Sequence, residues 1–118
     1  MTITYAWRGV FTDQEMPGVW ERVNAHSLGW VCARDADAAL AGFVNVAWDG
    51  DQHAFILDTW VDPDRRRAGI GTLLVKVAAE ESRAAGCTWL HVDFEPHLTS
   101  YYLESCGFRP TAAGLIAL

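Results

Sequence analysis

The chain has 118 residues, of which 51% are hydrophobic and 20% are charged, and its formal net charge is -6. This length predicts one domain, residues 1–118, while the acidic balance argues against a broad nucleic-acid-binding face. The first residues lack the apolar stretch of a signal peptide, and no window reaches the length of a membrane span. Three widely spaced cysteines without a CxxC pair are typical of reduced thiols. We therefore expect a cytoplasmic protein that binds neither nucleic acid nor a membrane.

The first half of the chain predicts a strand, a helical region and three further strands. Ile3, Tyr5 and Trp7 alternate with other residues, which is typical of a strand. Thr12-Asp-Gln-Glu15 has the capping-box pattern, so one short helix or a broken pair is expected up to His26. The next strands are predicted at 28–34, 40–48 and 54–61. Because only short turns separate these three strands, they should form an antiparallel meander.

The second half changes to helical spacing. Apolar residues recur with a helical period from Ile70 onward, and Gly86 is a natural end for that helix. Beyond it the pattern predicts a strand at 88–94, a short helix at 98–105 and short strands at 108–110 and 115–118. The strand–helix–strand unit should be a right-handed parallel crossover. The element order therefore predicts an α/β (α+β) fold, in which helices flank a mixed, mostly antiparallel sheet with a central parallel strand pair.

The segment from Val61 to Gly71, between a predicted strand and a predicted helix, carries the sharpest chemical signal. Its two glycines, Gly69 and Gly71, leave backbone N–H groups open at a helix start, which suits an anion. Arginines in the same turn add forked donors. The known nucleotide-binding glycine motifs do not fit the spacing. Local chemistry alone leaves two interpretations open, an anion site and a solvated glycine turn.

The pattern Val61-x-Pro63-x-x-Arg66-x-x-Gly69-Ile70-Gly71 resembles the acetyl-CoA motif of the GNAT superfamily of N-acetyltransferases. A second segment, from Tyr101 to Phe108, resembles the aromatic–Tyr and Gly-Phe segment of that superfamily. The resemblance covers about residues 28–108, and the predicted strand order agrees with it. It implies a GNAT-like sheet and an enzyme that moves an acetyl group from acetyl-CoA to an amine by direct attack in a ternary complex.

The resemblance also implies where acetyl-CoA binds. The pyrophosphate would be held by the turn, whose residues are Arg66, Arg67, Ala68, Gly69, Ile70, Gly71 and Thr72. The fourth and fifth strands would splay apart, and the pantetheine would pair with the backbone of Trp60 and Val61 like an added strand. No metal is implied. The pattern His91-x-Asp93-x-x-x-His97 is too incomplete for a ligand set, so we expect a solvated polar edge there.

Tyr102 is the candidate general acid for the leaving thiolate, with Tyr101 as the next choice. The superfamily usually places this tyrosine four residues before the glycine of Gly-Phe. Here Leu103 occupies that position and Tyr102 comes one residue earlier, which is about 100° of rotation on a helix. A packing role for Tyr102 is the structural alternative.

Three residues are candidates for the general base. Asp58 lies in an apolar strand, where burial would raise its pKa, although a buried Asp is often just hydrogen-bonded to backbone. His53 begins the same strand, where a solvated surface His is the alternative. Asp93 shares a strand face with His91 and would act through a water, unless the two form a surface ion pair.

Two other functions are compatible with the same pattern. One is a non-catalytic acyl-CoA-binding domain, a sensor or a degenerate relative, and the other is a domain that binds a phosphorylated ligand or nucleic acid through its arginine run. The acceptor stays unidentified, although a short region between the first two strands would leave an open site suited to a peptide terminus or a flexible amine. The apolar end, Leu115 to Leu118, is expected either to complete the sheet or to pair with a second subunit in a homodimer.

Overall fold

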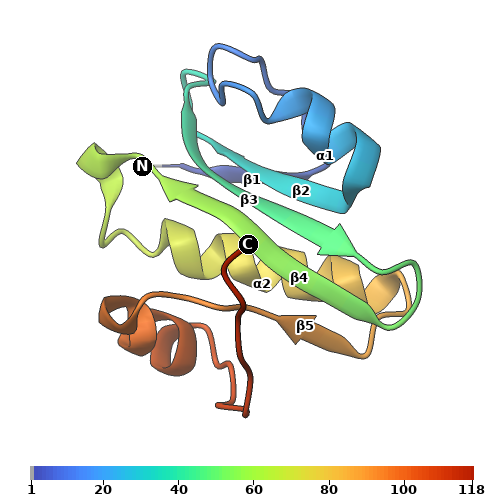
Figure 1. Ribbon diagram of the computed structural model, residues 1–118. Coiled ribbons are helices and arrows are strands. Elements are labelled where there is room, and N and C mark those ends of the chain that lie inside the picture. Colours follow the sequence, from blue (N-terminus) through green and yellow to red (C-terminus); the bar gives the residue numbers. More distant parts are fainter. Residues whose placement is uncertain (1) are drawn as a thin grey trace.

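A five-stranded sheet forms the centre of the molecule in the computed structural model, which describes residues 2–118 (Figure 1). The strands lie side by side in chain order: β1 (Thr4–Trp7), β2 (Ser27–Arg34), β3 (Leu40–Trp48), β4 (His53–Val61) and β5 (Trp89–His91). The first four pair antiparallel, and β4 and β5 pair parallel. The predicted meander and the mixed, mostly antiparallel sheet are therefore confirmed.

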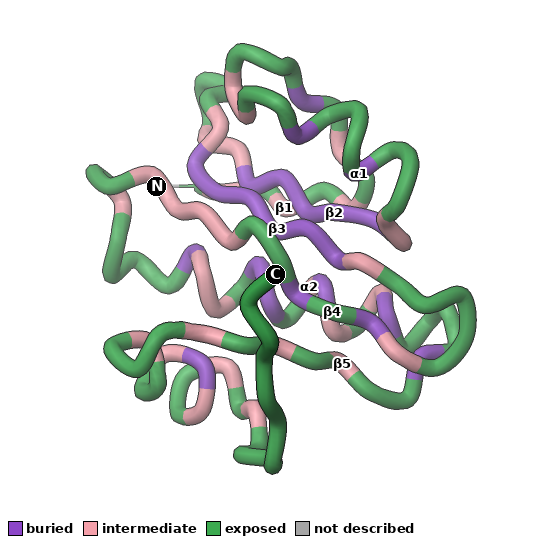
Figure 2. The backbone as a smooth tube through the Cα atoms, viewed as in Figure 1, coloured by how far each residue is buried: buried purple, intermediate pink, exposed green. Residues whose placement is uncertain are grey.

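Two helices cover opposite faces of the sheet (Figure 1). On β2, Val31 and Ala33 face α2 (Ile70–Ala84), whereas Trp30 and Cys32 face α1 (Trp20–His26). This alternation follows from the two-residue period of a strand. Figure 2 shows the result, with β2 and β3 almost entirely buried.

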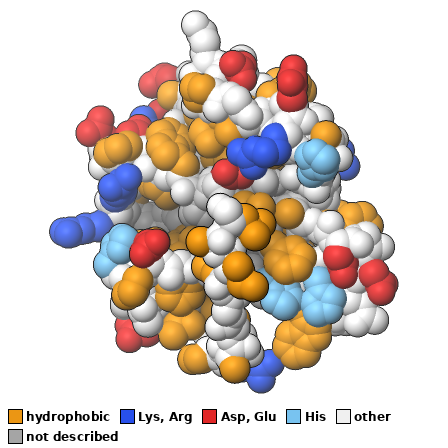
Figure 3. All heavy atoms as spheres, viewed as in Figure 1, with side chains coloured by type: hydrophobic (Ala, Val, Ile, Leu, Met, Phe, Trp, Pro, Cys, Tyr) orange, Lys and Arg blue, Asp and Glu red, His pale blue; other side chains and the backbone are white. Residues whose placement is uncertain are grey.

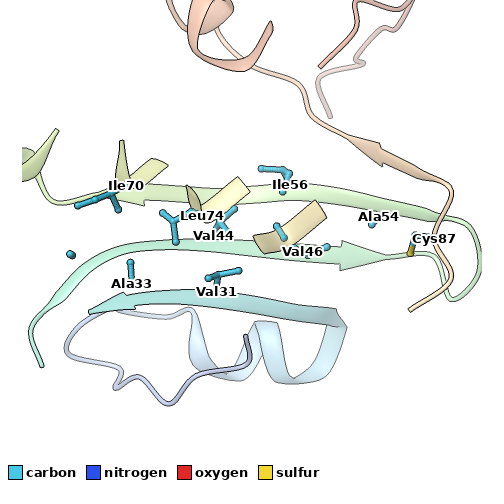
Figure 4. Close-up of a cluster of buried hydrophobic side chains, with 11 residues drawn as sticks. Val31, Ala33, Val44, Val46, Ala54, Ile56, Ile70, Leu74 and Cys87 are labelled. Atoms are coloured by element: carbon cyan, nitrogen blue, oxygen red, sulfur yellow. The ribbon is translucent and has the colours of Figure 1, made fainter. Parts of the chain in front are cut away.

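The larger of the two cores lies between α2 and the sheet (Figure 4). Ile70, Leu74 and Ala78 recur at four-residue spacing and bury one stripe of α2. The helix approaches β3 closely at Gly42, where a Cβ would lie only 2.9 Å from Leu74. The predicted helix from Ile70 is thus confirmed, and it connects the parallel pair β4 and β5.

The smaller core lies under α1 and is built from aromatic side chains. Phe11 meets Phe43 edge-on with 5.0 Å between the ring centroids. The predicted capping box forms, because Thr12 N–H donates to Glu15 Oε1 at 3.0 Å and Glu15 N–H donates to Thr12 Oγ1 at 3.2 Å. Turns follow it, however, and the α-helix covers only Trp20–His26. Gly18, between these turns and the helix, has a φ of 75°, which glycine adopts without strain.

The C-terminal part departs most from the predicted elements. The strand predicted at 88–94 is only three residues long. In place of the predicted helix at 98–105 the structure has a short 3-10 helix, η2 (Pro96–Leu98), and a π-helix, η3 (Ser100–Ser105). Another 3-10 helix, η1 (Pro63–Arg65), lies earlier in the chain, before α2. The strands predicted at 108–110 and 115–118 are wrong, since the structure assigns no strand there. All residues from 109 to 118 are exposed. A β-favouring sequence becomes a strand only when another strand is available to pair with it.

Within residues 2–118, no helix is both long and apolar enough to cross a membrane.

Leu74→Ala and Leu73→Ala form a matched test of the α2 core. Leu74 is 0% exposed and Leu73 is 42% exposed. We expect Leu74→Ala to lower the free energy of unfolding by about 2–5 kcal/mol through the cavity it leaves. Leu73→Ala should change it by less than about 1 kcal/mol. Urea denaturation measures both, and equal losses would contradict the assigned helix face.

Glu15 gives a pH-dependent contribution to stability. Hydrogen bonds from Arg34 lower the pKa of Glu15 from 4.5 to about 2. Because the folded-state pKa lies below the unfolded one, the stabilisation is complete above the ordinary value of 4.5 and disappears as the pH falls toward 2. We expect Glu15→Gln to lose about 1–3 kcal/mol at neutral pH. The difference in the free energy of unfolding between wild type and Glu15→Gln should shrink as the pH falls from 4.5 toward 2. A difference that stays constant over this pH range would contradict the prediction.

Candidate functional site

The parallel pairing of β4 and β5 stops early. It joins only His53–Phe55 to Trp89–His91, so the rest of β4 is paired on one side alone, with β3. The predicted separation is therefore confirmed along Asp58–Val61, whereas Leu90 and His91 still pair with β4. Trp60 and Val61, the predicted cofactor contacts, lie on this half-paired part of β4. A strand edge of this kind leaves backbone donors and acceptors open to an extended ligand.

A β-bulge interrupts β4 next to this edge. Phe43 pairs with Trp60 and Asn45 pairs with Leu57, so Asp58 and Thr59 together oppose one residue of β3. Asp58 has a φ of 55°, a conformation that L-residues rarely adopt. In a regular strand Asp58 would share the α2 side of Ile56. The bulge instead turns Asp58 toward α1.

The Asp58 carboxylate is held from two elements. Arg22 of α1 donates to both oxygens, at 2.7 Å to Oδ2 and 3.1 Å to Oδ1. Asn45 Nδ2 donates to Oδ2 at 3.0 Å, and Asn45 itself accepts a hydrogen bond of 2.5 Å from Ser27. Asn45 is only 2% exposed, so these bonds satisfy a buried amide.

The pKa of Asp58 is lowered, which corrects the expectation that burial would raise it. Desolvation does raise the pKa of this carboxyl. The hydrogen bonds from Arg22 and Asn45, together with the charge of Arg22, outweigh that effect. Asp58 is therefore a stable anion at neutral pH and a weak base.

Tyr102 reaches the same bulge from the other side. It is 5% exposed, and its hydroxyl donates to Thr59 Oγ1 at 3.3 Å. Phe94 stacks on its ring with 4.9 Å between centroids. The packing role of Tyr102 is therefore present, and its role as general acid stays a prediction.

The π-helical form of η3 explains the displaced tyrosine. Cys106 N–H donates to Tyr101 O, five residues back, at 2.9 Å. A π-helical turn contains one residue more than an α-helical turn. The five-residue separation of Tyr102 from Gly107 therefore fits one turn, and Tyr102 faces β4 despite standing one residue early.

The turn before α2 has the features of an anion site. Arg67 and Gly69 both have positive φ, at 70° and 80°. Gly69 is the N-cap of α2, no side chain caps this end, and no acidic residue lies in the first turn. The N–H groups of the first helical turn therefore lack partners inside the helix, and the dipole favours an anion there.

The three arginines of this turn differ in their contacts. Arg65 is bound to Asp35 and Asp62 and shapes the turn. Arg66 and Arg67 are exposed, as is Ala68 between them and the helix. The two exposed arginines are the ones that the sequence predicts for phosphate binding.

Tyr101 packs on the first turn of α2. A Cβ on Gly71 would lie 2.8 Å from the Tyr101 hydroxyl, so this contact requires glycine. The hydroxyl is buried and has no hydrogen-bond partner within residues 2–118. Burial raises the pKa of Tyr101. It is thus a poor proton donor, in contrast to its role as next choice after Tyr102.

The other two candidate bases, His53 and Asp93, lie on β4 and beyond β5. His53 begins β4 and precedes Asp58 by about 16 Å of extended strand. Its Nδ1 is 2.7 Å from His91 Nε2, and His91 stacks on Phe55. Asp93 is exposed beyond the end of β5. In the described part of the chain, no three His, Cys, Asp or Glu side chains form a group that would hold a metal ion.

Four residues of this site were not predicted from the sequence: Arg22, Ser27, Asn45 and Thr59. The sequence does contain a signal for Asn45, because it is the one polar side chain in the apolar strand between Leu40 and Trp48. The sequence contains no such signal for Arg22, since Arg22 precedes Asp58 by 36 residues and lies on a different element.

A family model matches most of the chain. The model described as the acetyltransferase (GNAT) family matches residues 4–108, which include the turn, the bulge and η3.

Solved structures share the fold at low sequence identity. A GNAT family acetyltransferase from Streptococcus pneumoniae has a TM-score of 0.80 and 23% identity, with 99% of this chain and 98% of that chain covered. A putative acetyltransferase from Deinococcus radiodurans has a TM-score of 0.76 and 22% identity, covering 97% and 87%. AAC(6')-Iy, in complex with the bisubstrate analogue CoA-S-monomethyl-acetylneamine, has a TM-score of 0.75 and 18% identity, covering 100% and 98%.

A curated protein, the mycothiol acetyltransferase of Mycolicibacterium vanbaalenii, is 37% identical over 60 residues. That match covers 51% of this chain and only 20% of the relative's length. Since the family model spans the chain from residue 4 to residue 108, this protein belongs to the GNAT acetyltransferase family.

Proposed function

We propose that the chain is an N-acetyltransferase that moves the acetyl group of acetyl-CoA to an amine by direct attack. The observation that carries this proposal is the β4 bulge, where Tyr102 lies on one side and Asp58 on the other. A single strand thus separates a proton donor from a carboxylate with a free acceptor position for an ammonium group. Membership of the family supports acyl transfer in general.

The residues at the turn and at the β4 edge fit acetyl-CoA. The uncapped N–H groups from Arg66 to Thr72, with the exposed side chains of Arg66 and Arg67, would bind the pyrophosphate. The half-paired backbone at Trp60 and Val61 would hold the pantetheine as an added strand. No metal takes part in this proposal.

The proposed reaction needs one acid and one proton acceptor. The amine nitrogen forms a bond to the acetyl carbon while the carbon–sulfur bond breaks, and Tyr102 gives its proton to the departing thiolate. Asp58, as a stable anion, binds and orients the amine as its ammonium form. The nitrogen loses one proton to water before it attacks and a second after the bond forms, and Tyr102 regains one proton from the solvent. His53 and Asp93 stay predicted alternatives for the base.

We also propose a cytoplasmic location. All three cysteines, Cys32, Cys87 and Cys106, are free thiols, which supports a reducing compartment.

Tyr102→Phe tests the general acid. We expect kcat to fall at least about 100-fold, because the thiolate then leaves without a proton. CoA affinity should stay within about threefold, because the ring packing is kept. Release of free thiol from acetyl-CoA with a panel of amines measures the rate. Tyr5→Phe on β1 is the matched control. An unchanged rate would remove Tyr102 from the mechanism, and tight CoA binding without turnover in the wild type would indicate a non-catalytic domain.

Gly71→Val tests the pyrophosphate turn. The added side chain collides with the Tyr101 hydroxyl, so Tyr101 or the first turn of α2 must shift. The valine side chain also stands beside the N–H groups of that turn and obstructs the approach of the pyrophosphate. We expect CoA affinity to fall at least about tenfold by calorimetry, with the far-ultraviolet circular dichroism retained. Gly114→Val, which meets open space, is the matched control. Equal affinity in the two variants would refute the assignment of this turn.

A further inference from the structure

The ion pair of Arg22 and Asp58 joins α1 to the bulge of β4, on the face of the sheet that α1 partly covers. Its side chains are 44% and 27% exposed, so solvent and ligands reach both. From this pair we infer that the acceptor is an α-amino acid with an apolar side chain, whose ammonium group binds Asp58 and whose carboxylate binds Arg22. This inference rests on the proposed acyltransferase function and names the substrate class of the same site.

The two side chains have unused hydrogen-bonding capacity. A carboxylate offers about four acceptor positions, and Asp58 uses three of them for Arg22 and Asn45. The free position is on Oδ1. Arg22 has five N–H donors, of which two bind Asp58. An acceptor position and several donors therefore lie next to each other, which matches an ammonium and a carboxylate carried on one carbon.

Charge balance favours a zwitterion over a simple amine. Because Arg22 neutralises Asp58, the pair has no net charge, and a monocationic amine is attracted by one partner and repelled by the other. A zwitterion interacts favourably with both. Charge-assisted hydrogen bonds to each end would also fix the direction in which the amine approaches the bulge.

The site is held rigidly enough to discriminate. Asn45 fixes the carboxylate of Asp58 from the buried side, and Ser27 in turn binds Asn45. Arg22 is anchored by two parallel bonds to Asp58, which restrict its guanidinium to one plane. Arg22 is thus a specificity-determining residue that neither the cofactor turn nor Tyr102 requires.

An apolar surface continues from the ion pair along β4. Leu57 is 43% exposed and Phe55 is 38% exposed, and alternate residues of a strand share a face about 7 Å apart. Leu57 is also the cross-strand partner of Asn45, which touches Asp58. Figure 3 shows the C-terminal tail crossing the viewed face, with hydrophobic and histidine side chains along it and beside it on the side of β4 and β5. An apolar or aromatic side chain of the acceptor would lie on Leu57 and Phe55.

Three matched acceptors test the inference: L-phenylalanine, L-phenylalaninamide and 2-phenylethylamine. All three carry the same amine and the same ring. Phenylalanine has a carboxylate, phenylalaninamide has a neutral amide in its place, and 2-phenylethylamine has neither. The amide also imitates a peptide N-terminus. Free-thiol release at saturating acetyl-CoA gives KM and kcat/KM for wild type, for Arg22→Gln and for Arg22→Lys. Arg83→Gln, an exposed arginine of α2, is the control.

We expect wild type and Arg83→Gln to prefer phenylalanine at least about tenfold over either analogue, mainly through KM. Arg22→Gln should abolish or invert this preference, because Asp58 is then an unpaired anion that favours a monocation. Arg22→Lys should keep part of it. Equal kcat/KM for the three acceptors in wild type, or a uniform loss for all three in Arg22→Gln, would overturn the inference.

Calorimetry of phenylalanine and phenylalaninamide against the CoA-loaded protein tests the acceptor class separately from the proposed acyltransferase activity. Tighter binding of phenylalanine in wild type, lost in Arg22→Gln, supports the inference whether or not turnover occurs. Equal binding overturns it. Discriminating binding without thiol release from any acceptor would overturn the proposed acyltransferase function alone. Thermal denaturation of each variant confirms that it is folded.

Discussion

The irregularity of β4 at Asp58 and Thr59 is the constraint on which the rest of the site depends. In an unbroken strand the two-residue period would direct Asp58 toward α2, into the apolar core. An ionised carboxylate there would lack polar partners. The extra residue turns Asp58 to the opposite side, where Arg22 and Asn45 bind it, and leaves Thr59 to meet Tyr102. The backbone strain of a positive φ at Asp58 accompanies this arrangement.

The site also depends on the early end of β5, which leaves one edge of β4 unpaired beside its bulge. Only three residue pairs join the parallel strands, so β4 has an open edge where it also bulges. The cofactor and the acceptor are then proposed to approach one short stretch of backbone from different sides. Such a meeting point suits direct transfer, in which both substrates must be bound together before the bond forms.

Much of this architecture could be predicted from the sequence, because its signals are local. The glycines and arginines of the turn, the stripe on α2 and the meander each follow from neighbouring residues. The bulge could not be predicted, since strand periodicity assigns Asp58 to the buried face of Ile56. Arg22 depends on a contact across 36 positions. The segment from 109 to 118 has strand-like residues without a neighbour to pair with, and sequence patterns do not show whether an edge is free.

The π-helical turn at Ser100–Ser105 has a consequence for how such sequences are compared. It absorbs an additional residue between the tyrosine and the glycine while the hydroxyl keeps its position against Thr59. In this segment the position of the tyrosine therefore depends on the number of helical turns before the glycine and not on the residue count. A search that demands a fixed number of residues would reject chains of this kind, and deleting one residue here should convert the turn to an ordinary α-helix.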